Sequence, residues 1–151
     1  MRQLQQTRLF LLLIVSLLCS ATAARADEKV FTNFGDYRVQ HTVFNSSFIK
    51  PDIASAYNLT RGADHALVNI AVLKNGSGAG SGSLAASVSG TVSNLMQQTK
   101  ALQFKEIKEG EAVYYLADLR FENEEVLHFN ITVTIGGRDL DVKFSKTLYV
   151  E

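Results

Sequence analysis

The chain has 151 residues and a single cysteine, and its fifteen Lys and Arg residues balance fifteen Asp and Glu residues. A neutral chain without a basic run gives no electrostatic support to nucleic-acid binding. A lone cysteine cannot form a disulfide within the chain or a cluster of thiolate metal ligands.

The N-terminal segment predicts export. Two arginines precede a predominantly apolar run from Leu9 to Leu18, and Ala24-Arg25-Ala26 follows. A basic start, an apolar stretch of about 7–15 residues and an A-x-A site are typical of a secretory signal peptide, whereas a transmembrane helix needs about 20 apolar residues. We therefore expect a cleaved signal peptide at residues 1–26, and one mature periplasmic domain at residues 27–151 with no membrane span.

Cleavage would change the composition of the mature protein. It would remove Cys19, so that disulfides, thiolate ligands and a cysteine nucleophile are all excluded. It would also remove three of the fifteen basic residues and none of the fifteen acidic ones, which leaves a net charge of −3. The leucines at positions 17 and 18 stand where a lipoprotein signal needs small residues, so we do not expect a lipid on Cys19.

Beyond the signal, apolar and polar residues alternate with period two, which predicts strands. The apolar residues of the first five predicted strands share one face in each strand. These strands cover residues 37–43, 66–72, 86–92, 102–104 and 113–119.

A hairpin is predicted near the C-terminus. Alternation runs from Leu127 to Ile135, Gly136-Gly137 can supply the positive φ angles of a tight turn, and alternation resumes from Leu140 to Phe144. Lys146 then falls in phase with the apolar residues. A bulge or a sheet edge would explain this break in the pattern.

About seven short strands with turn signals between them predict an all-β fold. Because most strands have one apolar and one polar face, we expect an immunoglobulin-like antiparallel β-sandwich of two packed sheets. A closed barrel is the alternative.

Two connections differ from the tight turns. Residues 75–83 consist largely of Gly and Ser and predict a flexible loop. Residues 45–64 contain the chain's single proline, Pro51, which can begin a helix. Ile53, Ala56 and Tyr57 would share one face of that helix, and Asn58 could end it. We expect a short helix that crosses from one sheet to the other, with Ile53 and Tyr57 closing an open end of the sandwich.

No catalytic constellation is visible in the sequence. His41, His65 and His128 lack the short spacings of zinc sites, and the glutamates at positions 122, 124 and 125 do not match a calcium loop. No Gly-x-Ser-x-Gly elbow is present. We predict no catalytic residue, no metal ligand and no cofactor, although three distant histidines could still meet in space.

The connection at residues 45–64 is the predicted interaction surface, because binding residues concentrate on long loops. It combines aromatic and aliphatic side chains with polar ones. The candidate residues are Phe44, Asn45, Ser46, Phe48, Lys50, Ile53 and Tyr57.

Several motifs resemble one family of exported proteobacterial proteins. They are Phe34-Gly35-Asp36-Tyr37, Phe44-Asn45-Ser46-Ser47-Phe48, Val88-Ser89-Gly90-Thr91-Val92, Phe104-Lys105-Glu106-Ile107 and residues 110–116, together with Pro51 and Tyr57. This pattern is similar to the family known as domain of unknown function 4426. The resemblance implies a periplasmic, immunoglobulin-like sandwich and implies no activity, cofactor or catalytic residue.

These observations favour a soluble, non-enzymatic periplasmic module that binds an unknown periplasmic protein or small ligand. Two alternatives stay open at this point. One is a metal-binding or hydrolytic envelope protein whose histidines and carboxylates meet only after folding. The other is a periplasmic assembly factor that pairs the edge of a sheet with a partner strand.

Overall fold

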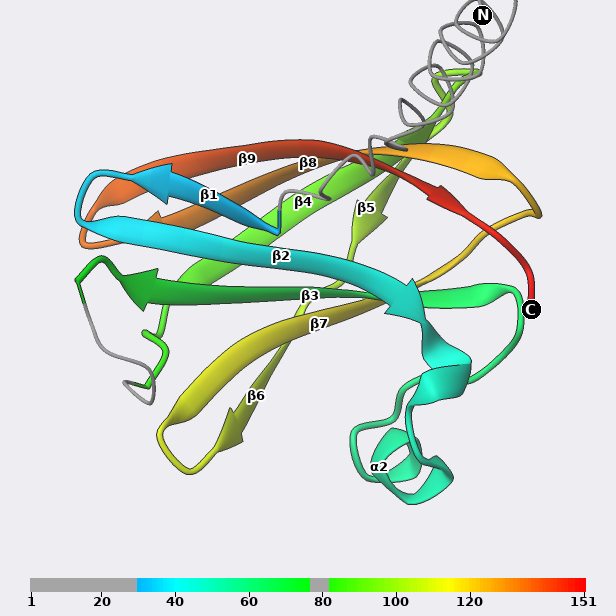
Figure 1. Cartoon of the computed structure of the whole chain (residues 1–151), viewed down its shortest axis with the longest axis horizontal. Helices are drawn as coiled ribbons and strands as arrows, with labels where there is room; N and C mark the ends of the chain where they lie inside the picture. Colours follow the sequence, from blue (N-terminus) through cyan, green and yellow to red (C-terminus); the bar gives the residue numbers. More distant parts are fainter. Residues whose placement is uncertain (1–29, 77–81) are drawn as a thin grey trace, which may run out of the picture.

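The computed structural model describes residues 30–76 and 82–151, which form two antiparallel sheets packed face to face (Figure 1). The predicted signal peptide at residues 1–26 and residues 77–81 of the Gly/Ser connection lie outside the described residues. In chain order the elements are β1 (Phe31–Phe34), β2 (Tyr37–Asn45), η1 (Ser46–Phe48), α2 (Pro51–Ala56), β3 (His65–Lys74), β4 (Ser87–Asn94), β5 (Thr99–Leu102), β6 (Lys105–Glu109), β7 (Ala112–Arg120), β8 (Glu125–Ile135) and β9 (Arg138–Leu148).

The predicted antiparallel sandwich is confirmed. One sheet has five strands in the order β1-β2-β3-β7-β6, and the other has four in the order β5-β4-β8-β9. Two strands differ from the prediction. The short strand β1 was not predicted, and the predicted strand at residues 102–104 is the point where the chain passes from β5 in one sheet to β6 in the other. Among the described residues, no helix has the length and apolarity needed to cross a membrane.

The main core lies between the sheets. Val39 and Val43 of β2, alternate residues of β3 and the inward residues of β8 and β9 are buried there. Phe129, with 1% of its surface exposed, stacks on Phe144 with ring centroids 4.8 Å apart. His41 stacks on the same Phe144 at 4.4 Å, so its apolar neighbours and its burial agree with the sequence pattern.

A second apolar cluster covers the outer face of the five-stranded sheet. Leu67, Ile107 and Leu116 point away from the main core and are buried under the η1–α2 connection by Ala54 and Leu59. Strand β3 is therefore buried on both faces. This explains why β3 carries apolar residues at nearly every position rather than at alternate ones.

The helix forms where it was predicted, but it does not cross between sheets. It connects β2 to β3, which are neighbours in the same sheet. Its buried residue is Ala54, while Ile53 is 41% exposed and Ala56 is exposed as well. Of the predicted face, only Tyr57 packs partly against the second apolar cluster. A small residue at position 54 lets this six-residue helix approach the sheet closely.

The end of the helix matches a Schellman motif. The N–H of Leu59 donates to the carbonyl of Ala54 at 2.8 Å, and the N–H of Asn58 donates to that of Ser55 at 3.2 Å. Asn58 has φ 52, as the left-handed residue of this motif requires. The prediction that Asn58 ends the helix is confirmed.

The C-terminal hairpin also follows the sequence. Gly136 and Gly137 have φ angles of 57 and 73, as the two central residues of a type I′ turn need. Strands β8 and β9 pair from Ile135–Arg138 to Glu125–Leu148 without a bulge. Because β9 is an edge strand, the edge explains why Lys146 interrupts the apolar alternation.

The two ends of the sandwich are built differently. We call the end formed by the tight turns at 35–36, 110–111 and 136–137, together with residues 75–76 and 82–86, the turn end. The opposite end, formed by residues 46–64, 95–98, 121–124 and 149–151, is the loop end.

Candidate interaction surface

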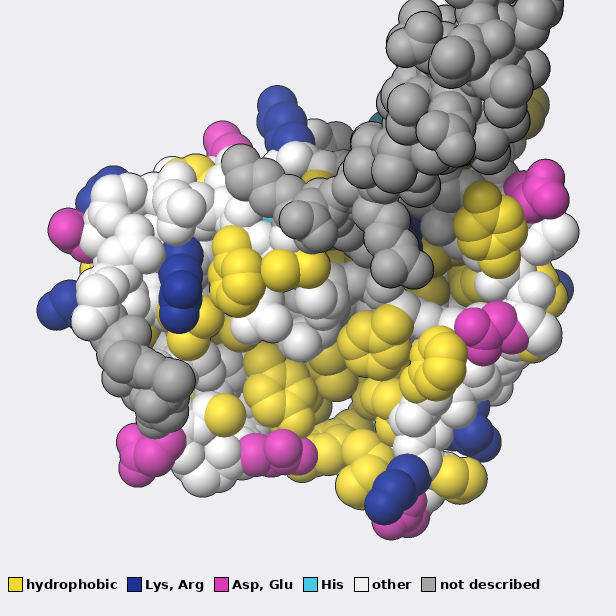
Figure 2. Space-filling view, viewed as in Figure 1, with side chains coloured by type: hydrophobic (Ala, Val, Ile, Leu, Met, Phe, Trp, Pro, Cys, Tyr) yellow, Lys and Arg dark blue, Asp and Glu magenta, His cyan; other side chains and the backbone are white. Residues whose placement is uncertain are grey.

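The loop end carries every large hydrophobic side chain that is exposed among the described residues. These six side chains come from three separate segments that the fold brings to one end. They are Phe48, Ile53, Leu95, Met96, Tyr149 and Val150. In Figure 2 hydrophobic side chains gather over the region of α2 and over the adjoining sheet, with charged side chains around the margin.

The seven residues predicted from the sequence divide into two groups. Phe48 is 70% exposed, and Lys50 and Ile53 are exposed as well, so these side chains are available to a partner. The other four are Phe44, Asn45, Ser46 and Tyr57. Phe44 and Tyr57 pack partly against the second apolar cluster, and Asn45 and Ser46 are buried.

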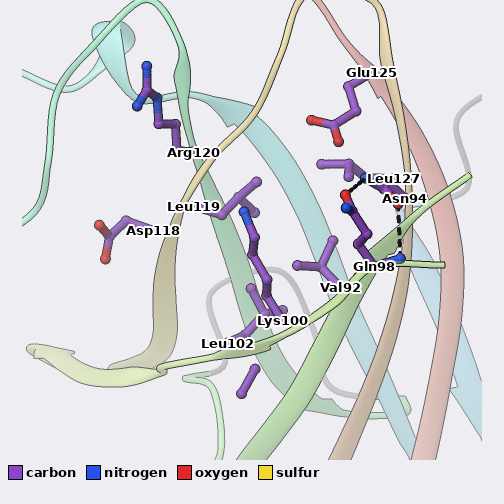
Figure 3. Close-up of a pocket in the computed structure, with 11 residues that line it drawn as sticks. Val92, Asn94, Gln98, Lys100, Leu102, Asp118, Leu119, Arg120, Glu125 and Leu127 are labelled. Atoms are coloured by element: carbon purple, nitrogen blue, oxygen red, sulfur yellow. Dashed lines mark hydrogen bonds between the residues drawn. The ribbon is translucent and has the colours of Figure 1, made fainter. Parts of the chain in front are cut away.

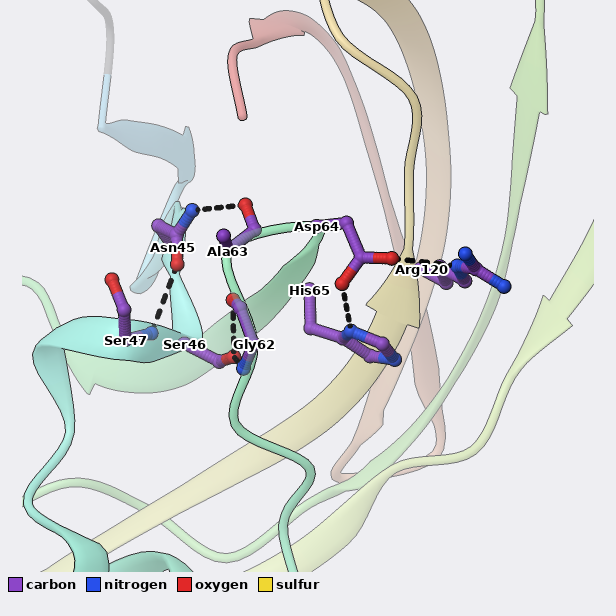
Figure 4. A network of polar contacts seen from close by, with 8 residues as sticks. All are labelled: Asn45, Ser46, Ser47, Gly62, Ala63, Asp64, His65 and Arg120. Atoms are coloured by element: carbon purple, nitrogen blue, oxygen red, sulfur yellow. Dashed lines mark hydrogen bonds and ion pairs between the residues drawn. The ribbon is translucent and has the colours of Figure 1, made fainter. Parts of the chain in front are cut away.

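The buried polar residues hold the connection together (Figure 4). Asn45 Oδ1 accepts the N–H of Ser47 at 2.9 Å, and its Nδ2 donates to the carbonyl of Ala63 at 2.8 Å. The Ser46 hydroxyl accepts the N–H of Gly62 at 3.0 Å. These bonds satisfy backbone groups that the irregular chain leaves without a ladder partner, so Asn45 and Ser46 position the surface from beneath.

An ionic network ties the same connection to the end of β7. Asp64 accepts a hydrogen bond from Arg120 Nε at 2.8 Å and lies 2.8 Å from His65 Nδ1. Hydrogen bonds from His65 and Arg120 lower the pKa of the Asp64 carboxyl. A Cβ at Gly62 would lie 2.8 Å from His65 Nδ1, so a larger residue there would displace the His65 ring.

The turn between β4 and β5 presents Leu95 and Met96 on a well-bonded frame. Asn94 Oδ1 accepts the N–H groups of both Met96 and Gln98 at 3.1 Å, and Asn94 Nδ2 donates to Gln98 Oε1 at 2.9 Å. Gln97 completes the turn with φ 60. The side chain of Asn94 thus bonds the turn internally, while the side chains of Leu95 and Met96 take no part in these hydrogen bonds and are exposed.

A cleft opens between the two sheets beside this turn (Figure 3). Its volume is about 240 Å³, and Val92, Leu102, Leu119 and Leu127 provide its apolar walls. The Lys100 side chain extends toward Leu119, and the Glu125 carboxylate points into the same space. A neighbouring hollow of about 440 Å³ shares Lys100 and Glu125 and reaches Met96.

A shallower groove of about 520 Å³ lies on the outer face of the five-stranded sheet, with Asn69, Ala71 and Leu73 among its lining residues. At its border the Tyr57 hydroxyl donates to Glu109 at 3.2 Å. Burial, together with the nearby Glu109 carboxylate, raises the pKa of Tyr114 to about 12. Both phenols are therefore neutral hydrogen-bond donors at physiological pH.

The three histidines lie in separate parts of the structure. His41 lies in the main core, His65 is bonded to Asp64 at the loop end, and His128 lies 2.6 Å from the Ser145 hydroxyl on the outer face of the four-stranded sheet. Within residues 30–76 and 82–151, no three His, Cys, Asp or Glu side chains are grouped to hold a metal ion.

Sequence reasoning missed four of the exposed residues: Leu95, Met96, Tyr149 and Val150. The signal for the first two was present in the sequence. Two large apolar residues stand between Asn94 and Gln97-Gln98, in a segment with no periodic neighbours to pack against.

Comparison with known proteins gives a family and similar solved structures, including the following two. The profile of a family described as "Domain of unknown function (DUF4426)" matches residues 31–151. A crystal structure of a DUF4426 family protein from Pseudomonas aeruginosa PAO1 is 30% identical, with a TM-score of 0.71 over 80% of this chain and 94% of that chain. FetP of uropathogenic E. coli strain F11, expressed in the periplasm of E. coli BL21(DE3), is 11% identical, with a TM-score of 0.53 over 79% and 92% of the two chains, and shows likeness of fold alone. No curated protein matches the chain.

Proposed function

The chain belongs to the DUF4426 family, as the motifs in its sequence predicted, and we propose its function from the structure of the loop end. The description of that family names no activity. The protein is an exported, non-enzymatic binding module of the periplasm. It recognises a partner protein through the exposed apolar side chains of the loop end. The N-terminal signal pattern supports the location.

One observation carries this proposal: the exposed large hydrophobic side chains of the described residues all lie at one end. Large apolar side chains that gather at one end of a domain are typical of interaction sites, because their exposure in a free monomer is unfavourable. The surroundings suit a protein partner, since the loop end also carries exposed charged residues such as Lys50 and Glu122.

The test replaces the apolar residues of the rigid turn. The double variant Leu95→Ser/Met96→Ser removes two exposed side chains and keeps the Asn94 frame. We expect an unchanged melting temperature and loss of the proteins that co-purify with the wild type from periplasmic extract. The matched control is Lys74→Ser/Glu111→Ser at the turn end, where two exposed side chains are also shortened. Equal capture by all three proteins would contradict the proposal.

A second candidate function rests on the inter-sheet cleft. A space of about 240 Å³ exceeds the roughly 150 Å³ cavity that accommodates benzene in an engineered protein. Its apolar walls, with Lys100 and Glu125 at the opening, suit a small amphipathic molecule. Chemical shift changes confined to Val92, Leu119 and Leu127 on titration with short-chain amines and carboxylates would support it. Shifts absent from these residues at millimolar ligand would contradict it.

A further inference from the structure

Strand β9 is a long edge strand of the four-stranded sheet. It has eleven residues, whereas the other three edge strands, β1, β5 and β6, have four, four and five. Within the described residues it pairs with β8 alone. A continuous edge of this length presents a row of N–H and C=O groups that another strand can use.

The outward side chains of β9 are complementary to themselves. Asp141 and Lys143 lie on either side of Val142, on the polar outer face of the four-stranded sheet. If two copies of β9 pair antiparallel about a two-fold axis at Val142, each Asp141 stands opposite Lys143 of the second copy. The symmetry then produces two ion pairs from one pattern.

This register is selected over its neighbours. A two-fold axis at Asp141 or at Lys143 would place that charge directly opposite its own copy, which is unfavourable. An axis between residues would pair outward with inward side chains, because the faces of a strand alternate. Of these registers, only the axis at Val142 sets Asp141 against Lys143 without placing either charge opposite its own copy.

The two charged groups are also free to pair. Thr132 on β8 donates to Asp141 Oδ1 at 2.9 Å, which orients the carboxylate and leaves its second oxygen without a hydrogen bond in the described structure. Lys143 makes no hydrogen bond or ion pair with any residue that the structure describes. Each group therefore has capacity for a new partner.

We propose that the protein forms a two-fold symmetric dimer by antiparallel pairing of β9 with β9 of a second copy, centred on Val142. The pairing covers Asp139 to Ser145, and it joins the two four-stranded sheets into one continuous sheet. It ends there because Arg138 would next stand opposite Lys146 of the second copy, with like charges. The dimer is independent of the binding proposed for the loop end.

Charge reversal tests the pairing and its register. In sedimentation equilibrium of the purified protein we expect a dimer, and a dissociation constant raised about tenfold by Asp141→Lys or by Lys143→Asp, because each change converts both symmetric contacts to like charges. The double variant Asp141→Lys/Lys143→Asp should restore dimerisation. The control Asp36→Lys/Lys74→Asp, away from β9, should leave it unchanged. A monomeric wild type at millimolar concentration, or a double variant as weak as the single ones, would overturn the proposal.

Cysteine cross-linking provides a second readout. The proposed register places Asp139 opposite Ser145 of the second copy. In a Cys19→Ser background, which removes the chain's only cysteine, a mixture of the Asp139→Cys and Ser145→Cys proteins should form a disulfide-linked heterodimer on mild oxidation. Either protein alone should cross-link much less. Equal cross-linking in all three samples would contradict this register.

Discussion

The two ends of this sandwich differ in the residues that adopt positive φ angles in their turns. At the turn end, five glycines of the described residues adopt positive φ: Gly35, Gly76, Gly110, Gly136 and Gly137. At the loop end, the positive φ angles belong to Asn58, Gln97 and Glu124. A left-handed backbone conformation is less favourable in free energy for a residue with a side chain than for glycine.

At the loop end, residues with side chains occupy left-handed positions that glycine occupies at the turn end. The turn end has small residues and tight turns, while the loop end keeps side chains even where glycine would be less strained. Strained backbone that persists tends to occur at functional sites. Here it coincides with the exposed Leu95 and Met96, which lie in the same turn as Gln97. The comparison therefore supports the loop end as the binding end.

A substitution in the core between the two ends should change stability more than a substitution at either end. Phe129 is 1% exposed and stacks on Phe144. We expect Phe129→Ala to lower the free energy of unfolding by about 3–5 kcal/mol, because it leaves a cavity in the main core. Chemical denaturation measures it. A loss below about 1 kcal/mol would mean that this face of β8 is not buried.

Within the loop end, two aromatic residues should behave differently. Tyr57 packs on the second apolar cluster and bonds Glu109, while Phe48 is mostly exposed. We expect Tyr57→Ser to destabilise the protein by about 1–3 kcal/mol and Phe48→Ser to change stability by no more than about 0.5 kcal/mol. Thermal and urea unfolding of both variants check this. Equal destabilisation would place Phe48 in the core as well.

A pair of glycine exchanges compares the two ends directly. A Cβ at Gly137 meets nothing within 4 Å, so Gly137→Ala tests the backbone angle alone. We expect it to cost about 1–2 kcal/mol. The reverse change at the loop end, Gln97→Gly, should not destabilise the protein by more than about 0.5 kcal/mol, since relief of strain offsets the added freedom of the unfolded chain. Destabilisation of similar size in both variants would remove the contrast between the ends.

The smallest expected effect is on the stability of the protein at acidic pH. Because the pKa of Asp64 is lowered in the folded protein by His65 and Arg120, its contribution to stability is present above the unfolded pKa of about 4. That contribution is lost as the pH falls from there through the folded pKa. We expect Asp64→Asn to flatten the decline of melting temperature in this window. Lys50→Gln, which removes an exposed loop-end charge, is the control, and equal declines in Asp64→Asn and wild type would contradict the effect.

The sequence predicts most strands well because most of them have one buried face and one exposed face. The alternation from Leu127 to Ile135 could be read directly, since the odd positions of β8 enter the main core. It failed at residues 102–104, where Leu102 and Phe104 keep the same phase while the chain changes sheets. Periodicity records which side is apolar and contains no information on which sheet a strand joins.

The candidate site was predicted only in part, for local reasons. The connection at residues 45–64 was correctly identified as irregular, but Asn45 and Ser46 turned out to be buried, because they bond backbone atoms of Gly62 and Ala63 that are distant in sequence. Tyr149 and Val150 were missed because apolar residues that follow a strand have the same appearance in the sequence whether they are exposed or buried. Only the folded arrangement brings these segments to one end.

The strand order has a consequence for how the chain acquires its structure. Strand β3 pairs with β7, and β4 pairs with β8, so each central pair spans a long stretch of chain that belongs partly to the other sheet. Such interleaved pairing gives a high contact order and slow folding. The four-stranded sheet lacks half of its strands until β8 and β9 are present, and these are the last two strands in the order of the chain. A polypeptide with this topology can therefore close the core between its two sheets only after residues 125–148 have been added.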